Sequence, residues 1–332
     1  MKKCCAILLI VSILLCGCRL TETQPQLNAT YLDLFDTVTT IVGSGMTQRE
    51  FQAEAQKIYD QLQTYHRLFD IYNEYSGIQN LKTVNDHAGA GPVVVDRAII
   101  DLLLDCKAYY ELTGGKVNAA MGSVLRLWHE ARSAGLEDPE NAKLPDLEAL
   151  SQAMMHMDFE NVLIDEEAST VYLPDPEMSL DVGAIAKGWA AQRVAENAPS
   201  GLLISVGGNV CATGAKADGS AWVVGVQNPD GGDYLKKLPI TGGAVVTSGD
   251  YQRTFTVDGK NYHHIIDPNT GMPSQYWRSV TVICADSGLA DALSTALFIM
   301  TREDGEVLAK QCNAQAVWVD KEGQQFSTKN FE

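Results

Sequence analysis

Two oxygen-bearing side chains on one predicted helix could hold a hard metal ion. In the run 289–297, the carboxylate of Asp291 and the hydroxyl of Thr295 stand four residues apart, so they share one face of the helix. Such oxygen donors suit Mg²⁺ better than zinc. The alternative is that the Thr295 hydroxyl bonds a carbonyl of its own helix, as threonine hydroxyls inside helices often do.

A second group of candidate residues lies where a strand is expected to end and a helix to begin. Asp181 stands at or near the predicted N-cap, and small residues at Gly183, Ala184 and Ala186 keep the first turn slender. The backbone of such a turn can approach an anionic ligand, to which Lys187 adds a positive charge. The alternative is a capped helix that packs tightly on the sheet.

A histidine and a carboxylate form the third group. His264 is predicted on a strand, and Asp267 follows in a turn that contains Pro268 and Gly271. His264 could act as a general base or position a phosphate, while Asp267 could orient the histidine or cap the turn. Because side chains alternate along a strand, His263 should point outward and take no part in the chemistry.

Glycine-rich turns after two predicted strands complete the candidate site, in the runs 205–209 and 247–251. Turns of this kind let a sheet come close to a ligand. The common catalytic and nucleotide-binding signatures are missing from the sequence: it contains no G-x-G-x-x-G after a strand, no P-loop, no H-E-x-x-H and no G-x-S-x-G.

The charge balance limits the possible partners. The 332 residues are 45% hydrophobic and 20% charged, which is typical of a globular chain with one large or two modest domains. Its 25 basic and 42 acidic residues give a net charge of −17. Nucleic acid is therefore excluded as a partner, because binding to a phosphate backbone needs surplus Lys and Arg. An anionic ligand would need a metal ion, a local lysine or helix N-termini.

The N-terminus is typical of an exported lipoprotein. Two lysines precede an apolar run over 6–15 that is too short to span a membrane, which needs roughly 20 residues. The following Leu15-Cys16-Gly17-Cys18 resembles a bacterial lipobox, so we expect a signal peptide over 1–17, a lipid on Cys18 and a tether over 18–30. The chain would then be anchored to the outer face of the cell membrane. The alternative is ordinary signal-peptide cleavage and a soluble secreted product.

Four cysteines remain in the body of the chain, at 106, 211, 284 and 312, and none belongs to a C-x-x-C pair. Scattered cysteines of this kind are more often small buried apolar residues than a zinc site, and disulfides stay open in an exported protein.

Periodicity predicts an α+β fold with a mixed β-sheet core flanked by helices. We expect a single domain over 31–332 that is rich in helices up to about residue 160 and rich in strands after it. The predicted helices cover 48–69, 96–113, part of 139–157, 183–197, 289–300 and 304–312. The predicted strands cover 162–173, 202–206, 222–227, 245–247, 253–257, 264–266, 280–284 and 316–319.

Taken together and in this order, these segments resemble the ApbE family, the FAD:protein FMN transferases. The resemblance runs from about Tyr31 to Val319 and is specific, because seven separated motifs coincide in order. Besides the groups above, its motifs are 35–40 (FDTVTT), 69–73 (FDIYN), Asn85, 115–118 (GKVN), Met121-Gly122 and Trp128.

The resemblance implies an ApbE-like (T-fold-like) architecture and an Mg²⁺-dependent reaction. Members of the family cleave FAD, attach FMN through a phosphoester bond to a Thr or Ser of an acceptor flavoprotein, and release AMP. An electron-transfer complex subunit would be a natural acceptor.

Roles for individual residues follow from the same resemblance. It assigns the Mg²⁺ ligands to Asp291, Thr295 and the backbone carbonyl of Ala184, and catalysis to His264 with Asp267. The FAD contacts that it implies fall on Asp181, Lys187, His264, Asn73, Thr40, Asn118, Ala119 and Ala120. At 118–120 the sequence departs from the family's usual Asp/Pro/Thr-like run, which puts those three contacts in doubt.

Two other functions stay open at this stage. The same site could hydrolyse FAD to FMN and AMP with water as the acceptor. Alternatively, the chain could be a lipoprotein that binds flavin without catalysis.

Overall fold

A computed structural model describes residues 26–329 and 331. The predicted signal peptide, Cys18 and most of the predicted tether lie outside these residues. None of the helices in the described part is both long enough and apolar enough to cross a bilayer.

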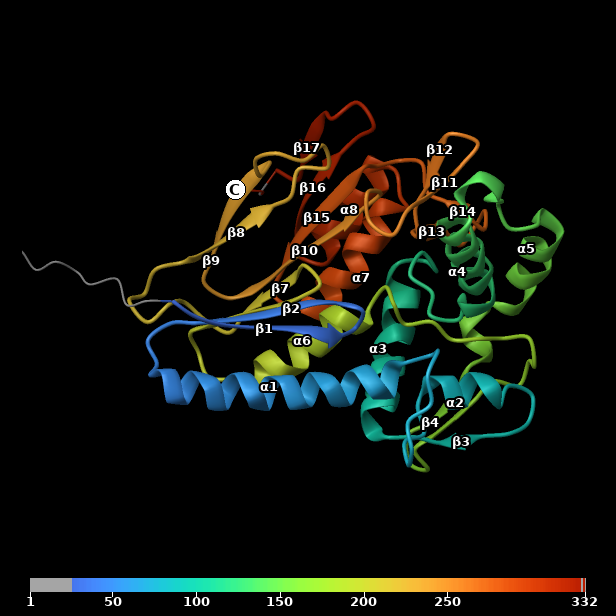
Figure 1. The fold of residues 1–332 in the computed structure, drawn as a ribbon, viewed down its shortest axis with the longest axis horizontal. Coiled ribbons are helices and arrows are strands. Elements are labelled where there is room, and N and C mark those ends of the chain that lie inside the picture. Colours follow the sequence, from blue (N-terminus) through green and yellow to red (C-terminus); the bar gives the residue numbers. More distant parts are fainter. Residues whose placement is uncertain (1–25, 330, 332) are drawn as a thin grey trace, which may run out of the picture.

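The molecule is built on one eight-stranded antiparallel sheet, in the order β1-β2-β6-β7-β10-β15-β16-β17 (Figure 1). The predicted α+β class is confirmed, but every pair of neighbours in this sheet is antiparallel, whereas we expected a mixed sheet. The strands are β1 (Leu27–Leu34), β2 (Thr37–Gly43), β6 (Leu202–Val206), β7 (Asn209–Ala212), β10 (Gly243–Gly249), β15 (Ser279–Cys284), β16 (Gln315–Val319) and β17 (Gln325–Ser327).

The first two strands were not predicted, and the first of them begins before the expected start of the domain at residue 31. Strand β1 begins at Leu27, so the last four residues of the predicted tether belong to the sheet. Phe35 and Asp36 connect β1 to β2 with φ of 52° and 51°, the left-handed conformation that two-residue hairpin turns need. Because β2 pairs with β6, the composition change near residue 160 does not separate two structural units.

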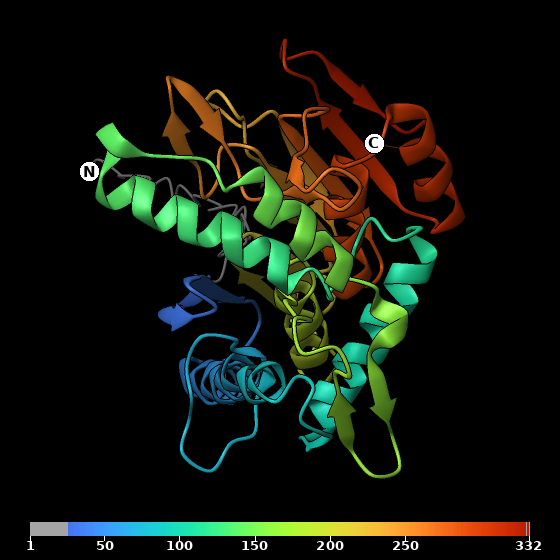
Figure 2. The same cartoon turned by 90° about the vertical axis from the view of Figure 1, so that its right-hand side faces the viewer.

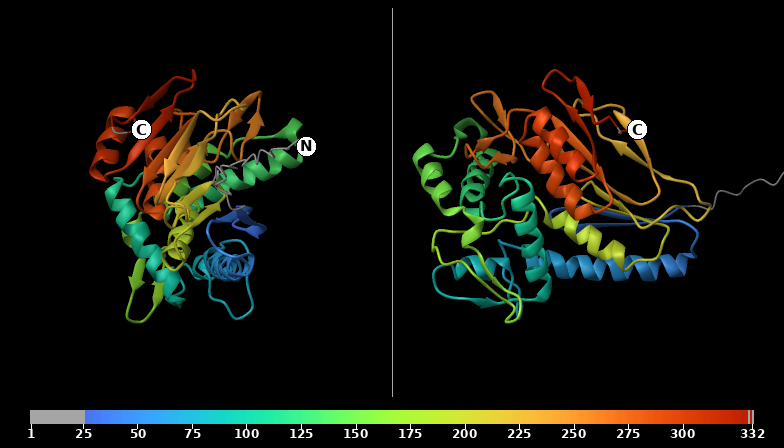
Figure 3. Two further views of the ribbon diagram at one scale, coloured as in Figure 1. Left: turned by 90° about the vertical axis from the view of Figure 1, so that its left-hand side faces the viewer. Right: turned by 180° about the vertical axis from the view of Figure 1, so that it is seen from behind.

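Helices α1 (Gln48–Phe69), α6 (Ala186–Glu196) and α7 (Ser287–Phe298) cover one face of the sheet (Figure 3). Helix α1 has the predicted bounds and begins with a capping box between Thr47 and Glu50. Helices α3 (Arg97–Leu112) and α8 (Arg302–Gln311) were predicted to within two residues at each end. The other face is covered by the hairpin of β8 (Trp222–Val226) and β9 (Lys236–Ile240), which packs on β7 and β10.

A smaller hydrophobic cluster lies beside the sheet and walls the site. It joins helix α4 to two short hairpins (Figure 2), and Trp128 of α4 donates a hydrogen bond to the Gly271 carbonyl oxygen at 2.8 Å. Helix α4 was not among the predicted helix ranges, and no side chain caps its start at Met121. The elements are α4 (Gly122–Glu137), α5 (Leu147–Ala153), β11 (Phe255–Val257), β12 (Lys260–Tyr262), β13 (Ile266–Asp267) and β14 (Met272–Pro273).

Two strand predictions near the site need correction. Arg253 precedes β11 in a left-handed conformation, with φ of 47°. His264 lies in the connection between β12 and β13 instead of on a strand. The remaining elements are helix α2 (Leu81–Asp86), which was not predicted, and a three-stranded sheet of β3 (Val93–Val94), β4 (Leu163–Asp165) and β5 (Thr170–Tyr172).

Candidate active site

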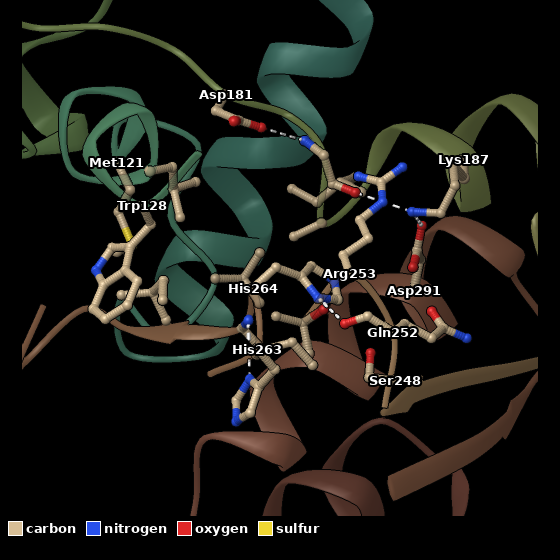
Figure 4. Close-up of a pocket in the computed structure, with 18 of the residues that line it drawn as sticks. Met121, Trp128, Asp181, Lys187, Ser248, Gln252, Arg253, His263, His264 and Asp291 are labelled. Carbon is tan, nitrogen blue, oxygen red and sulfur yellow. Dashed lines mark hydrogen bonds and ion pairs between the residues drawn. The ribbon is translucent and has the colours of Figure 1, made fainter. Parts of the chain in front are cut away.

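A cavity of about 260 Å³ lies between the central sheet, the start of α6, α7 and the α4 cluster (Figure 4). A second hollow of about 210 Å³ adjoins it, and six residues line both: Asp36, Tyr72, Asp181, Gly183, Lys187 and Arg253. Of the residues proposed from the sequence, the larger cavity brings together Asn118, Ala119, Asp181, Ala184, Lys187, His264, Asp291 and Thr295.

Asp291 holds the start of α6 against α7. Its carboxylate Oδ2 accepts a hydrogen bond from the Gly188 backbone N–H at 2.8 Å and lies 3.9 Å from Lys187 Nζ. The side chain is buried, so desolvation raises the pKa of Asp291, and the charge of Lys187 opposes part of that rise. The contact joins residues 103 positions apart in the chain.

That contact also frees the backbone carbonyl of Ala184. In a regular helix the N–H of Gly188 would donate to this carbonyl, four residues earlier, but here it donates to Asp291. The preceding carbonyl, of Gly183, accepts from Lys187 Nζ at 3.0 Å. Within the described residues, the Ala184 oxygen accepts no backbone hydrogen bond outside regular elements, and Ala184 lines the cavity.

Thr295 stands one turn after Asp291 and also lines the cavity. The hydroxyl that bonds the helix's own backbone is that of Ser294, which donates to the Asp291 carbonyl at 2.9 Å. Among the hydrogen bonds of the described residues, none involves the Thr295 hydroxyl. The bond to the helix's own backbone, which was the alternative for Thr295, is therefore made by Ser294. The Thr295 hydroxyl can offer its oxygen to a ligand.

The donor set fits Mg²⁺. It consists of a carboxylate, a hydroxyl and a backbone carbonyl, which are the hard oxygens that this ion prefers, and Mg²⁺ commonly completes its shell with water and substrate phosphates. In the described part of the chain, no three His, Cys, Asp or Glu side chains come together as a metal cage. Cys106, Cys211, Cys284 and Cys312 are free thiols.

Glycine at 188 is required for this arrangement, and we predict that Gly188→Ala disturbs it. A methyl group there would lie 2.4 Å from Asp291 Cβ and 2.4 Å from the Ser287 carbonyl oxygen, so α6 and α7 must separate. We expect a loss of about 2 kcal/mol in the free energy of unfolding, together with weaker binding of Mg²⁺. Urea denaturation would measure the first effect and a Mg²⁺ titration the second.

The matched control is Gly242→Ala, because a methyl group at 242 meets no atom within 4 Å. That variant should stay within about 0.5 kcal/mol of the wild type. Equal stability of the two variants would show that the α6–α7 contact does not depend on glycine.

His264 lies on the opposite wall with one ring nitrogen occupied. Its Nδ1 is 3.2 Å from the Gln252 carbonyl oxygen, and because a carbonyl can only accept, Nδ1 carries the proton and Nε2 keeps its lone pair. Desolvation, followed by the positive charges of Arg253 and Lys187, lowers the pKa of His264 below its ordinary value of 6.5. At neutral pH the ring is therefore uncharged, and Nε2 presents a lone pair that can accept a hydrogen bond from a ligand.

His263 is not outward-facing as expected. Its Nε2 donates to the Ser274 carbonyl at 2.8 Å, its Nδ1 accepts from the Ile265 N–H at 3.2 Å, and its ring packs edge-on against Phe298. The ring is buried, so its place is structural.

Asp267 caps its turn and does not orient His264. Its carboxylate accepts hydrogen bonds from Lys116 Nζ at 3.2 Å and from the Asn269 N–H at 3.0 Å. Asp267 is not among the described residues that line the cavity. The carbonyl of Gln252 holds the imidazole instead, so of the two alternatives for Asp267 the structure shows the turn cap and not the orientation of His264.

The remaining predicted FAD contacts divide between the two hollows and the structure around them. Asn118 lines the cavity, but its side chain bonds Met157 and Ala120, which makes it a brace for its own loop. Ala120 and Thr40 are not among the described residues that line either hollow. Asn73 lines the second hollow, with its amide donating to Asp70 at 3.0 Å.

Several cavity residues were absent from the predicted site: Tyr72, Arg132, Asn209, Gln252 and Arg253. Asn209 had a signal, since it ends one of the glycine-rich turns; its buried Nδ2 has no hydrogen-bond partner in the described residues and lies near Asp291. The lining holds four Lys or Arg residues against three Asp. The cavity therefore carries a local positive balance within a chain of net charge −17.

Comparison with known proteins places the chain among flavin transferases. A model of the ApbE family matches residues 35–318. An FAD:protein FMN transferase of Treponema pallidum is 34% identical over 282 residues, covering 79% of this chain and 75% of that protein. One from Klebsiella pneumoniae is 33% identical over 278 residues, covering 81% and 83%.

Solved structures agree. The ApbE protein of Thermotoga maritima superposes with a TM-score of 0.82 at 32% identity, covering 92% of this chain and 98% of that one. The flavin transferase ApbE of Vibrio cholerae has a TM-score of 0.74 at 23% identity, over 92% of this chain and 99% of that chain, and shares the fold.

Proposed function

Since the chain belongs to the ApbE family and is a flavin transferase, we propose that it cleaves FAD with the help of Mg²⁺ and transfers FMN to a Thr or Ser hydroxyl of an acceptor flavoprotein. AMP is the leaving group. One observation supports this proposal above the others: a single cavity is lined by the free Ala184 carbonyl, the buried Asp291 carboxylate and the uncharged imidazole of His264.

Asp291, Thr295 and the Ala184 carbonyl would hold the metal. When bound, Mg²⁺ would neutralise charge on the pyrophosphate and on the departing AMP. Lys187 is fixed beside this site by its bond to the Gly183 carbonyl, and it supplies a positive charge that needs no rearrangement.

His264 is the proposed base, and the negative charge of bound FAD would offset the charges of Arg253 and Lys187 that help to lower the pKa of this histidine in the free protein. Its Nε2 takes the proton of the acceptor hydroxyl while the hydroxyl oxygen attacks the phosphorus of the FMN half. The bond between that phosphorus and the bridging oxygen breaks, and the oxygen leaves with AMP. The proton on His264 then returns to solvent, and the acceptor carries FMN through a phosphoester bond.

Water could take the place of the acceptor hydroxyl, because the same base would activate either nucleophile. Hydrolysis of FAD to FMN and AMP is therefore the outcome that the assay must separate from transfer. A protein that only binds flavin would need neither a proton acceptor nor a metal site.

On this proposal the chain is exported and held at the outer face of the membrane through a lipid on Cys18. The support is the lipobox-like run at 15–18 after a short apolar leader. Detection of a diacylated N-terminal Cys18 by mass spectrometry would test the anchor, and a mature chain without lipid would exclude it.

The proposed function predicts that the acceptor gains covalent flavin. Incubation with FAD, Mg²⁺ and a candidate acceptor should give in-gel flavin fluorescence on the acceptor band and one AMP per flavin transferred. EDTA should stop both, and added Mg²⁺ should restore them. An acceptor whose target threonine is replaced by alanine is the control.

Two results would contradict it. Release of AMP without labelled acceptor, for every acceptor tried, would indicate a pyrophosphatase. No AMP under any condition would indicate a flavin-binding protein.

A further inference from the structure

Arg253 is a cation in the cavity that forms no close ion pair within the described residues, although the carboxylates of Asp36 and Asp181 line the same two hollows. Its side chain is exposed to the cavity, and no ion pair or hydrogen bond of the described residues involves it. Two other cations of the cavity have acidic partners. Lys187 lies near Asp291, and Lys116 pairs with Asp267. Arg132 also lacks an acidic partner in the described chain, but it lines the larger cavity alone.

The position of Arg253 is the boundary between the two hollows. It lines both, as do Lys187 and Gly183. Figure 4 shows its side chain extending from the His264 side of the cavity toward Lys187. A ligand with two bulky halves, one in each hollow, would place the link between its halves at this shared wall.

The backbone at Arg253 is held in a costly conformation. Its φ of 47° is unusual for a residue with a side chain, and such strain persists where the surroundings fix it. The base of the loop is fixed in this way: the Asp250 N–H donates to the Arg278 carbonyl at 2.8 Å, and Lys321 Nζ donates to the Asp250 carboxylate at 2.9 Å. The fold thus keeps a strained residue whose guanidinium is aimed into the site.

We infer that Arg253 binds the pyrophosphate of the dinucleotide and makes the site selective for phosphate-bearing flavin over riboflavin. This inference rests on the proposed function. A guanidinium presents paired N–H donors that match phosphate oxygens, and charge-assisted hydrogen bonds of this kind are stronger than neutral ones. At the shared wall, the positive charges of Arg253 and Lys187 counter the carboxylates of Asp36 and Asp181, which would otherwise repel a dianionic ligand.

Equilibrium binding without Mg²⁺ tests the inference apart from turnover. Flavin fluorescence quenching would follow FAD and riboflavin, and calorimetry would follow ADP, for the wild type, Arg253→Met and Arg253→Lys. We expect Arg253→Met to weaken FAD and ADP binding about tenfold, the loss of one charge-assisted contact, with riboflavin unchanged within about twofold. Arg253→Lys should recover part of the affinity because it restores the charge without the paired donors.

The control is Lys260→Met. Lys260 is a nearby cation on β12 that does not line either hollow among the described residues, so its removal changes the net charge equally and should leave all three affinities unaltered. Wild-type affinity for FAD and ADP in Arg253→Met would overturn the inference, and so would an equal loss for riboflavin, which would show that Arg253 only shapes the cavity. Failure of the wild type to release AMP would instead contradict the proposed function.

Discussion

Replacing Asp291 by asparagine should reduce Mg²⁺-dependent release of AMP from FAD by a factor of about 10³. Metal stabilisation of developing phosphate charge is worth several kcal/mol, and each ~1.4 kcal/mol changes a rate tenfold. Asparagine keeps the shape but removes the charge of the one carboxylate in the proposed donor set. Chromatography of AMP over a Mg²⁺ titration would measure the loss.

The fold should survive this change, and its pH dependence gives a second readout. Desolvation raises the pKa of Asp291 in the folded protein, so the wild type loses stability as the pH rises above the unfolded-state pKa of about 3.8 through the higher folded value. Asp291→Asn lacks that loss. Its stability relative to the wild type should therefore be greater at pH 7 than at pH 4, as measured by urea denaturation.

Glu303→Gln is the control for loss of a carboxylate. Glu303 is an exposed residue in the first turn of α8 and does not line the cavity in the described chain. It should keep wild-type activity. Full activity in Asp291→Asn as well would remove the metal assignment.

His264→Gln should slow FMN transfer by about 10²–10⁴, the usual contribution of a positioned general base. FAD affinity should change by less than about threefold, because glutamine keeps polar contact with the cavity but accepts no proton at neutral pH. Single-turnover transfer rates, compared with Kd from flavin fluorescence, would separate the two effects.

The matched control is His87→Gln, since His87 is exposed at the end of α2 and its ring bonds only the Thr83 carbonyl in the described chain. It should transfer FMN at the wild-type rate. If His264→Gln instead bound FAD much more weakly with unchanged turnover, His264 would hold the nucleotide without acting on the acceptor.

Much of the site could be predicted where its geometry is local. The capping box at Thr47 and the apolar spacing after it define α1 within a contiguous stretch of chain. The four-residue interval between Asp291 and Thr295 likewise puts both on one face of a helix, whatever that helix packs against. These predictions needed only rules that operate within one turn or one segment.

Errors arose where a side chain had two possible partners. The sequence allowed Asp267 either to orient His264 or to cap its turn. In the structure, Lys116, 151 positions away, donates a hydrogen bond to the Asp267 carboxylate and helps to hold it away from His264. His263 was expected to face outward from strand alternation, but that segment is not a strand, and the ring fits between Ser274 and Phe298. Strand β2 was also missed; it pairs with β1 in a local hairpin and with β6, which lies far along the chain.

By itself, the sequence determined the chemical types at the site and their spacing along each helix, because capping and periodicity are properties of neighbouring residues. Only the tertiary structure decided that the Gly188 N–H donates to Asp291 instead of to the Ala184 carbonyl. It also decided that Arg253 and Lys187 line both hollows. Those facts depend on how closely α6, α7 and the loop after β10 approach one another. Such approach is set by packing across the whole molecule, which no single segment encodes.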